Sequence, residues 1–190
     1  MRIISGTARG LKLKTPKGFD TRPTGDRVKE SVFNILNGLT DFSAVENVLD
    51  IFAGTGALGF ESLSRGAKGA TFIDFATADL ISENALHGKF QNYKILRGDF
   101  SKMLKKLSNQ NCKFDLIFSD PPYKKNLAGA SINLVAKLNL LTENGLMVVE
   151  TGADEILNVD SLNCIRKINY GRTTSISIFQ MTDLRKQKTD

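Results

Sequence analysis

The residues best suited to chemistry lie in one short loop, Ser119-Asp-Pro-Pro-Tyr123, which follows an apolar run. Pro121 and Pro122 have a fixed φ angle and no N–H group, so the loop offers carbonyl acceptors with few donors nearby. Asp120 adds carboxylate oxygens, and Tyr123 adds a flat ring. Acceptors beside an aromatic face suit the exocyclic amino group of a planar base. The loop therefore predicts a base-binding catalytic edge, the alternative being a proline turn capped by an aspartate.

A second motif spans residues 47–59, where an apolar run passes into a glycine-rich turn. Its glycines fit the spacing G-x-G-x-x-G, in which the backbone approaches a nucleotide at a helix N-terminus. They are Gly54, Gly56 and Gly59. Asp50 precedes the turn, and Asp74 lies twenty residues after Gly54, the distance expected for an acid that binds ribose hydroxyls. The alternative for Asp74 is a helix cap.

Apolar runs alternate with helical patterns between these motifs and beyond them, which predicts an α/β fold with a parallel, doubly wound sheet. The expected strands begin at Asn47, Ala70, Tyr93, Phe114 and Leu146. The first four end at an acid, and these acids are Asp50, Asp74, Asp99 and Asp120. Because ligands bind such sheets at the carboxyl ends of the strands, the four aspartates predict a single site.

The two ends of the chain differ from this pattern. Residues 3–4 and 11–13 suggest a small hairpin, followed by a helix capped by Thr24 or Asp26. Apolar residues at three- and four-residue spacing give that helix a buried face, formed by Val28, Val32, Ile35, Leu36 and Leu39. Residues 174–179 alternate polar and apolar, which predicts a terminal antiparallel hairpin. The tail, 183–190, has a disordered composition.

Positive charge is concentrated at the amino end. The net charge is +6, and residues 1–40 hold eight Lys/Arg against three Asp/Glu. Such a segment fits contact with a phosphate backbone, although any one of these charges could equally be solvated surface. The residues expected to contact nucleic acid are Arg9, Lys12, Lys14, Arg22 and Arg27.

The composition excludes several classes of protein. Cys112 and Cys164 are the two cysteines, far apart and without the spacing of a metal site, so neither zinc nor a disulfide framework is expected. No apolar run has the length of a membrane span, and the start lacks a signal-peptide core. We expect a cytoplasmic, metal-free protein of 190 residues, monomeric, with one well-cored domain.

The two motifs together resemble the class I S-adenosylmethionine-dependent methyltransferases that modify exocyclic amines of bases. The amino end resembles a narrower group, the RsmD family of bacterial 16S rRNA guanine-N2 methyltransferases. This second resemblance rests on Arg2-Ile-Ile-Ser-Gly6, Arg22-Pro-Thr24, Asp26-Arg-Val-Lys-Glu30 and Phe33-Asn34, continued by Ala57-Leu-Gly59 and Leu63-Ser-Arg-Gly-Ala67. It covers nearly the whole chain apart from the tail.

This resemblance implies a Rossmann-like class I fold: a mostly parallel seven-stranded sheet with helices on both faces, a terminal antiparallel hairpin and a small amino-terminal appendage. It implies an appendage over 1–40 that guides RNA, a methyltransferase domain over 41–182 and S-adenosylmethionine as cofactor, with S-adenosylhomocysteine as product. The implied cofactor residues are Asp50, Phe52, Ala53, Gly54, Thr55, Gly56, Asp74, Asp99 and Phe100. The implied catalytic residues are Asp120, Pro121, Pro122 and Tyr123.

One departure from the family pattern concerns ribose binding, since the usual Glu is the shorter Asp74 and a second acid is replaced by Ala76. The implied substrate is a guanine in 16S rRNA or in an assembling small ribosomal subunit. Three alternatives stay open: an adenine-N6 methyltransferase, which would share the Asp-Pro-Pro-Tyr loop, an NAD-binding oxidoreductase, and an RNA-binding module without activity.

Overall fold

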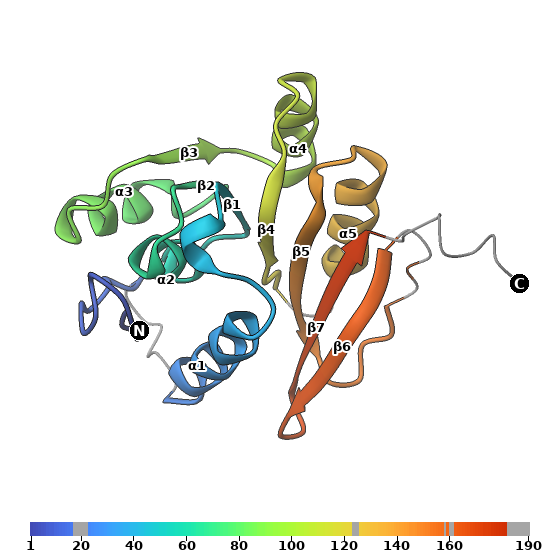
Figure 1. The fold of residues 1–190 in the computed structure, drawn as a ribbon, viewed down its shortest axis with the longest axis horizontal. Helices are drawn as coiled ribbons and strands as arrows, with labels where there is room; N and C mark the ends of the chain where they lie inside the picture. The colour runs from blue at the N-terminus through green and yellow to red at the C-terminus, as the bar shows by residue number, and fades with distance from the viewer. Residues whose placement is uncertain (17–22, 123–125, 158, 160–161, 182–190) are drawn as a thin grey trace, which may run out of the picture.

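A computed structural model describes residues 1–16, 23–122, 126–157, 159 and 162–181 of the chain. At its centre is a seven-stranded sheet with the order β3-β2-β1-β4-β5-β7-β6 (Figure 1). The strands are β1 (Asn47–Ile51), β2 (Gly69–Asp74), β3 (Tyr93–Arg97), β4 (Phe114–Ser119), β5 (Leu141–Gly152), β6 (Leu162–Tyr170) and β7 (Thr174–Met181). The first five are parallel, while β7 is antiparallel to β5 and β6. The predicted sheet and terminal hairpin are therefore confirmed.

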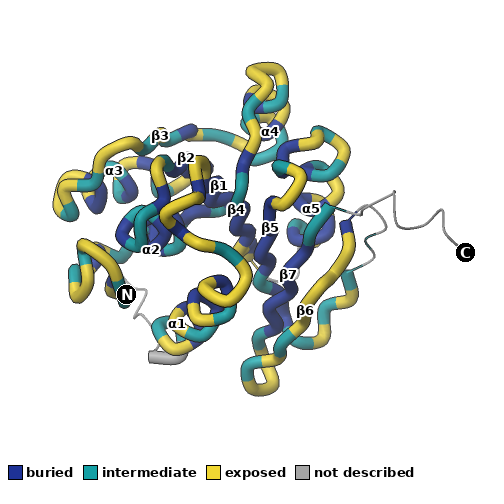
Figure 2. Tube along the Cα trace, in the orientation of Figure 1, coloured by how far each residue is buried: buried dark blue, intermediate teal, exposed yellow. Residues whose placement is uncertain are grey.

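Helices cover both faces of the sheet, as predicted. One face carries α1 (Pro23–Asn37), the short 3-10 helix η1 (Phe42–Ala44), α2 (Ala57–Arg65) and α3 (Ala78–His87). The other carries α4 (Phe100–Asn109) and α5 (Leu127–Lys137). Figure 2 shows buried strands between helices whose outer sides are exposed. Two apolar clusters result, one on each face, because a strand in the middle of a parallel sheet is buried on both sides.

The amino-terminal residues pack on the first of these clusters. Ile3 and Leu13 are buried there together with one face of α1. Residues 2 and 12 form an isolated antiparallel bridge, so the predicted hairpin is present without two regular strands. The prediction for Leu39 is wrong: α1 ends at Asn37, and Leu39 beyond it is 45% exposed.

The strand order determines where a ligand site can form. From β1 the chain moves outward through β2 to β3, and it then returns to place β4 on the other side of β1. At this reversal the connections leave the carboxyl ends of β1 and β4 in opposite directions, which opens a crevice between them.

Candidate active site

A cleft of about 1030 Å³ occupies this crevice. Its floor includes Phe118 of β4 and Ile176 of β7, and Val28 and Val32 of α1 form one wall. The glycine turn after β1 and the loop after β4 both line the cleft, so the tertiary structure brings the two predicted motifs together. α1, predicted only as part of an appendage, is also part of the site.

The glycine turn fits close approach of a ligand to the backbone. Phe52 and Gly54 have φ angles of 61° and 56°, in the left-handed region that costs most residues energy. A Cβ atom on Gly54 would have no neighbour closer than the Phe52 carbonyl oxygen at 4.0 Å, so space is open above this peptide. A Cβ on Gly59 would instead lie 2.3 Å from the Phe72 ring, and its absence lets α2 pack closely on β2.

Asp50 is buried at the end of β1 and lines the cleft. Its Oδ2 accepts a hydrogen bond from the Gly59 N–H at 3.0 Å, which fastens the first turn of α2 to the strand. Burial raises the pKa of this carboxyl well above its usual value, with smaller contributions from the negative charges of Asp120 and Asp74. A cationic ligand group in the cleft would relieve this cost.

Asp74 organises the same turn from β2. Its Oδ2 accepts from the Gly54 N–H at 2.9 Å, and its Oδ1 accepts from the N–H groups of Ala76 and Thr77, each at 2.8 Å. One carboxylate therefore holds the glycine turn and the start of α3 together. Asp74 itself is outside the cleft lining, whereas Ala76 and Thr77 belong to it. A ribose contact of Asp74 stays a prediction.

Asp99 and Phe100 lie further from the cleft. Asp99 is exposed and caps α4, accepting from the Lys102 N–H at 3.1 Å and the Ser101 hydroxyl at 2.6 Å, and these bonds lower its pKa. The Phe100 ring packs on Phe52 with centroids 4.8 Å apart. Neither residue is part of the cleft lining, and Phe100 is connected to the site through Phe52.

Asp120 stands at the mouth of the cleft, directly after β4. Its side chain is reachable from the open cleft, yet the walls remove enough water to raise the pKa of Asp120 to about 8, with the charge of Glu150 adding to the shift. The strand end is held by a hydrogen bond of 2.8 Å between the hydroxyls of Ser119 and Ser131. The predicted partner Tyr123 lies outside the described residues.

Glu150 was missed by the sequence reasoning. It belongs to β5, next to β4, and it lines the cleft together with Asp120, Pro121 and Pro122. The signal was available, because Leu146–Glu150 is a fifth apolar run that ends in an acid. Its carboxylate helps to make the cleft acidic around Asp120.

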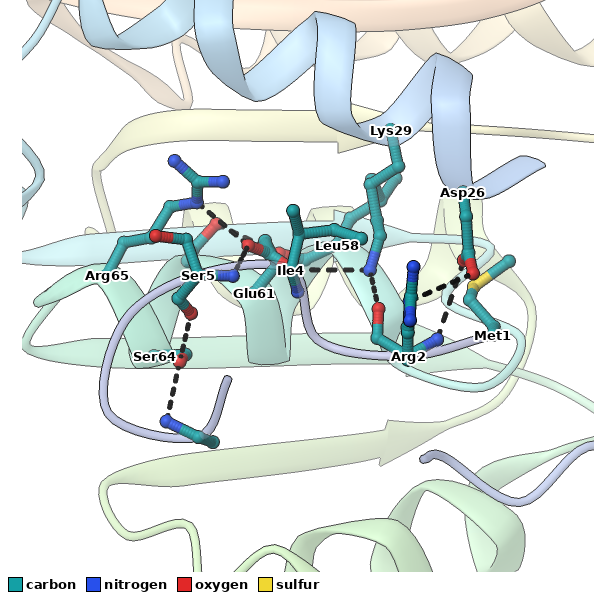
Figure 3. A network of polar contacts seen from close by, with 12 residues as sticks. Met1, Arg2, Ile4, Ser5, Asp26, Lys29, Leu58, Glu61, Ser64 and Arg65 are labelled. Carbon is teal, nitrogen blue, oxygen red and sulfur yellow. Dashed lines mark hydrogen bonds and ion pairs between the residues drawn. The ribbon is translucent and has the colours of Figure 1, made fainter. Parts of the chain in front are cut away.

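Lys29 is not a surface charge. It is buried between α1 and α2, where its Nζ donates to the Arg2 carbonyl oxygen at 2.5 Å and to Glu61 Oε2 at 3.2 Å (Figure 3). Glu61 also accepts from the N–H groups of Ile4 and Ser5 and from Arg65 Nε. This network fastens the amino-terminal segment to the core, which brings Met1 to the cleft and its sulfur within 3.7 Å of Thr55 Oγ1.

The residues predicted to contact RNA have different surroundings. Arg9, Lys12 and Arg27 are exposed. Lys14 is exposed and pairs with Glu83 at 3.0 Å. Arg22 lies outside the described residues.

One buried polar atom at the cleft has no hydrogen-bond partner among the described residues. Thr77 lines the cleft at the start of α3, directly after the turn held by Asp74, and its Oγ1 is this buried atom. Buried hydroxyls are nearly always satisfied, so this atom indicates a ligand partner. Together with the open space above Gly54, it shows that the cleft fits a polar nucleoside-like cofactor.

Two kinds of feature are absent from the described part of the chain. No group of three or more His, Cys, Asp or Glu side chains there is arranged to hold a metal ion. No helix in that part has the length and apolar character needed to cross a membrane.

Comparisons with known proteins agree with this architecture. A putative rRNA methyltransferase, YlbH, of Bacillus subtilis is 35% identical over 185 residues, covering 95% of this chain and 98% of that protein. The ribosomal RNA small subunit methyltransferase D of Haemophilus influenzae is 40% identical over 161 residues, 83% of this chain and 81% of that protein. A crystal structure titled putative methyltransferase yhhF from Escherichia coli superposes with a TM-score of 0.82 at 32% identity, covering 95% of this chain and 97% of that one.

The family model described as conserved hypothetical protein 95 matches residues 1–180, nearly the whole chain and both motifs. The chain therefore belongs to this family, the RsmD family of methyltransferases.

Proposed function

We propose that this protein transfers a methyl group from S-adenosylmethionine to the exocyclic N2 of a guanine in 16S ribosomal RNA. The observation that carries the proposal is the meeting of the glycine turn and the Asp120-Pro-Pro loop across one cleft. Relatives named as ribosomal RNA small subunit methyltransferases support ribosomal RNA as the substrate class. A ribosomal RNA substrate also supports a cytoplasmic location for this protein.

The cofactor would lie along the glycine turn, and when bound it supplies an electrophilic methyl group on a sulfonium centre. The proposed contacts are those of Asp50, Phe52, Ala53, Gly54, Thr55 and Gly56, with Asp74, Asp99 and Phe100 on the ribose and adenine side. The raised pKa of Asp50 supports a cationic ligand near β1. Because Phe100 is outside the cleft lining, its contribution would be made through Phe52. Thr77 joins this set on the evidence of its unpartnered hydroxyl.

The loop after β4 would hold the amine. Guanine N2 is a weak nucleophile because its lone pair is delocalised into the ring, and two acceptors on its N–H groups favour the pyramidal, reactive form. We propose Asp120 and the Pro121 carbonyl as those acceptors, and both residues line the cleft. Correct alignment of nucleophile and methyl group can supply about 7–11 kcal/mol of the barrier.

Asp120 would also stabilise the positive charge that develops on the amine and accept the proton that the amine loses. The nitrogen becomes positive as the new bond forms, and carboxylates at the cleft mouth stabilise that charge. A pKa of about 8 makes Asp120 an effective proton acceptor near neutral pH, since such a group is ionised often enough and still binds a proton well.

The RNA would reach this edge from the amino-terminal side. We propose that residues 1–40 guide RNA and that residues 41–182 carry the chemistry, with Arg9, Lys12, Lys14, Arg22 and Arg27 contacting phosphates. The target base would leave its stack and enter the cleft, with Tyr123 as a stacking partner. Nothing in this scheme requires a second copy of the chain, and we propose a monomer.

The test is a methyl-transfer assay with labelled cofactor on unmodified 16S ribosomal RNA and on small subunits, followed by nucleoside analysis. We expect label in N2-methylguanosine. Label in N6-methyladenosine would show the adenine-N6 alternative instead. Binding of NAD in place of S-adenosylmethionine, or RNA binding with no transfer to either substrate, would overturn the proposal in favour of an oxidoreductase or an inactive RNA-binding module.

A further inference from the structure

A second hollow, outside the active site, is formed by the loop of residues 7–11 and by the turns that follow α2 and α3. We call it the basic groove, and its volume is about 630 Å³, within the range of about 300–1,000 Å³ typical of small-molecule sites. The residues that define it here are Arg9, Lys68, His87, Lys89, Phe90 and Gln91.

The charged side chains that line the basic groove are positive. Arg9, Lys68 and Lys89 come from three separate segments, and all three are exposed. None of the described residues that line the groove is acidic, and none of these three cations forms an ion pair with a described residue. The pKa of Asp41 is lowered mainly by hydrogen bonds from Ser43, and the charge of Lys68 adds to this shift. By contrast, Asp50, Asp120 and Glu150 line the active-site cleft.

The loop that carries Arg9 is held firmly in place. The Thr7 N–H donates to the Ser64 carbonyl oxygen at 2.8 Å, and the Ala8 N–H donates to Ser64 Oγ at 2.9 Å. Ser64 Oγ in turn donates to the Ser5 carbonyl oxygen at 2.6 Å. Because the loop is fixed before any ligand arrives, binding there would lose little conformational entropy.

One segment joins the basic groove to the active site. Residues 1–8 follow α2 along its length: the Met1 sulfur lies 3.7 Å from Thr55 Oγ1 before the helix, and the Ala8 N–H donates to Ser64 Oγ near its end. Figure 3 shows Met1 and Ser64 at opposite ends of this stretch. A helix of nine residues is about 14 Å long. That distance, about four stacked nucleotides at 3.4 Å each along one strand, separates the groove from the Thr55 side of the cleft.

We propose that the basic groove binds phosphates of the substrate RNA a few nucleotides from the methylated base, and so sets which guanine reaches the cleft. This inference rests on the proposed function and adds a binding site formed by Lys68, His87 and Lys89 together with Arg9. Three cations around a polyanionic backbone give charge complementarity without reading base identity.

The experiment compares two triple variants with the parent protein. The groove variant is Arg9→Gln, Lys68→Gln and Lys89→Gln, and the control is Lys105→Gln, Lys106→Gln and Lys137→Gln, which removes the same charge from exposed positions on α4 and α5 at the other face of the sheet. Binding to an unmodified 16S rRNA transcript is measured as a function of salt, and S-adenosylmethionine binding is measured separately.

We expect the control to match the parent and the groove variant to bind RNA roughly tenfold or more weakly near 0.1 M salt. The slope of the logarithm of its RNA-binding constant against the logarithm of the salt concentration should become shallower by about 2 to 3, the sum for three lost phosphate contacts. Cofactor affinity should stay unchanged, which would show that the cleft is intact. Equal RNA binding by the two triple variants would overturn the inference.

A photo-reactive side chain at position 91 gives a second measurement on a nearly native protein. It should crosslink to nucleotides close to the methylated guanine, whereas the same group at position 105 should not. Absence of a crosslink from position 91, with methylation retained, would also overturn the inference. A failure of the proposed function is distinguishable, because the parent itself would then transfer no methyl group to 16S rRNA.

Discussion

Glu61 of α2 and Lys29 of α1 form an ion pair of 3.2 Å in which the side chains are 0% and 3% exposed. Burial lowers the pKa of Lys29, and the charge and hydrogen bond of Glu61 oppose this shift. Glu61 is the centre of the network, because it also accepts from Arg65 and from two N–H groups of the amino-terminal segment. The pair therefore links α1, α2 and residues 1–5, three parts of the chain that surround the cleft.

This arrangement predicts unequal costs for the two partners. Glu61→Ala should lower the free energy of unfolding by about 3–5 kcal/mol, since it leaves Lys29 and two N–H groups buried without their acceptor. Lys29→Met should lower the free energy of unfolding by less, because Glu61 keeps its ion pair with Arg65. Urea denaturation gives both values. Glu83→Ala, in an exposed pair with Lys14, is the matched control and should cost about 0–1 kcal/mol. The reverse order for Glu61 and Lys29 would contradict the role given to Glu61.

Asp120→Asn should separate activity from stability. The amide cannot accept a proton, so methyl transfer should fall on the order of 100-fold or more. In the parent, activity should rise as the carboxyl ionises, reach half its maximum near the pKa of about 8 and level off above it. Steady-state rates from pH 6 to 9 check this, and a flat profile for the parent would show that ionised Asp120 is not needed.

Asp120→Asn should raise the stability of the protein at alkaline pH, although it lowers the activity. The folded-state pKa of about 8 lies above the ordinary 3.8, so folded protein binds this proton more tightly than the unfolded chain does. The free energy of unfolding of the parent should therefore fall as pH rises between these two values, and the asparagine variant should escape this loss. Denaturation at pH 4 and pH 9 should show equal stability at the first and an advantage for the variant at the second.

Thr77→Val tests the unpartnered hydroxyl at the cleft. Removing a buried, unsatisfied polar group should leave the stability of the free protein equal or higher. Affinity for S-adenosylmethionine should fall by up to about tenfold, the value of one net hydrogen bond. Ser175→Ala is the control, since Ser175 Oγ is also buried without a partner but is not part of the cleft lining. Calorimetric titration that finds equal affinities for both variants would remove Thr77 from the site.

Gly6→Ala should displace the loop that carries Arg9. Gly6 has a φ angle of 82°, and a Cβ there would lie 1.7 Å from the Ser64 carbonyl oxygen. Gly10 has a similar φ of 86° with nothing within 4 Å, so Gly10→Ala carries the backbone strain alone, about 1–3 kcal/mol. The Gly6 variant should lose more stability than the Gly10 variant and should bind RNA more weakly at unchanged net charge. Equal effects would mean that contact with Ser64 does not position the loop.

The sequence by itself determined the sheet and the aspartates along its edge. The apolar runs Val48–Leu49 and Leu116–Phe118 are typical of strands that are buried on both faces of a parallel sheet. Because parallel strands end at the same edge of the sheet, the aspartates that follow these runs lie at one edge. The glycine spacing and the two prolines are local signals, because they act on the backbone of their own residues.

Only the tertiary structure decided which charged residues share a site. Lys29 reads in the sequence as one more cation of a basic segment, but the packing of α1 on α2 buries it against Glu61. Asp99 follows its strand as Asp120 does, yet β3 is at the edge of the sheet, two strands from β1, and there Asp99 caps α4. Lys68 and Lys89 are far apart in the chain and meet Arg9 only because α2 and α3 end side by side. Charge and burial depend on such long-range neighbours, and no spacing along the chain encodes them.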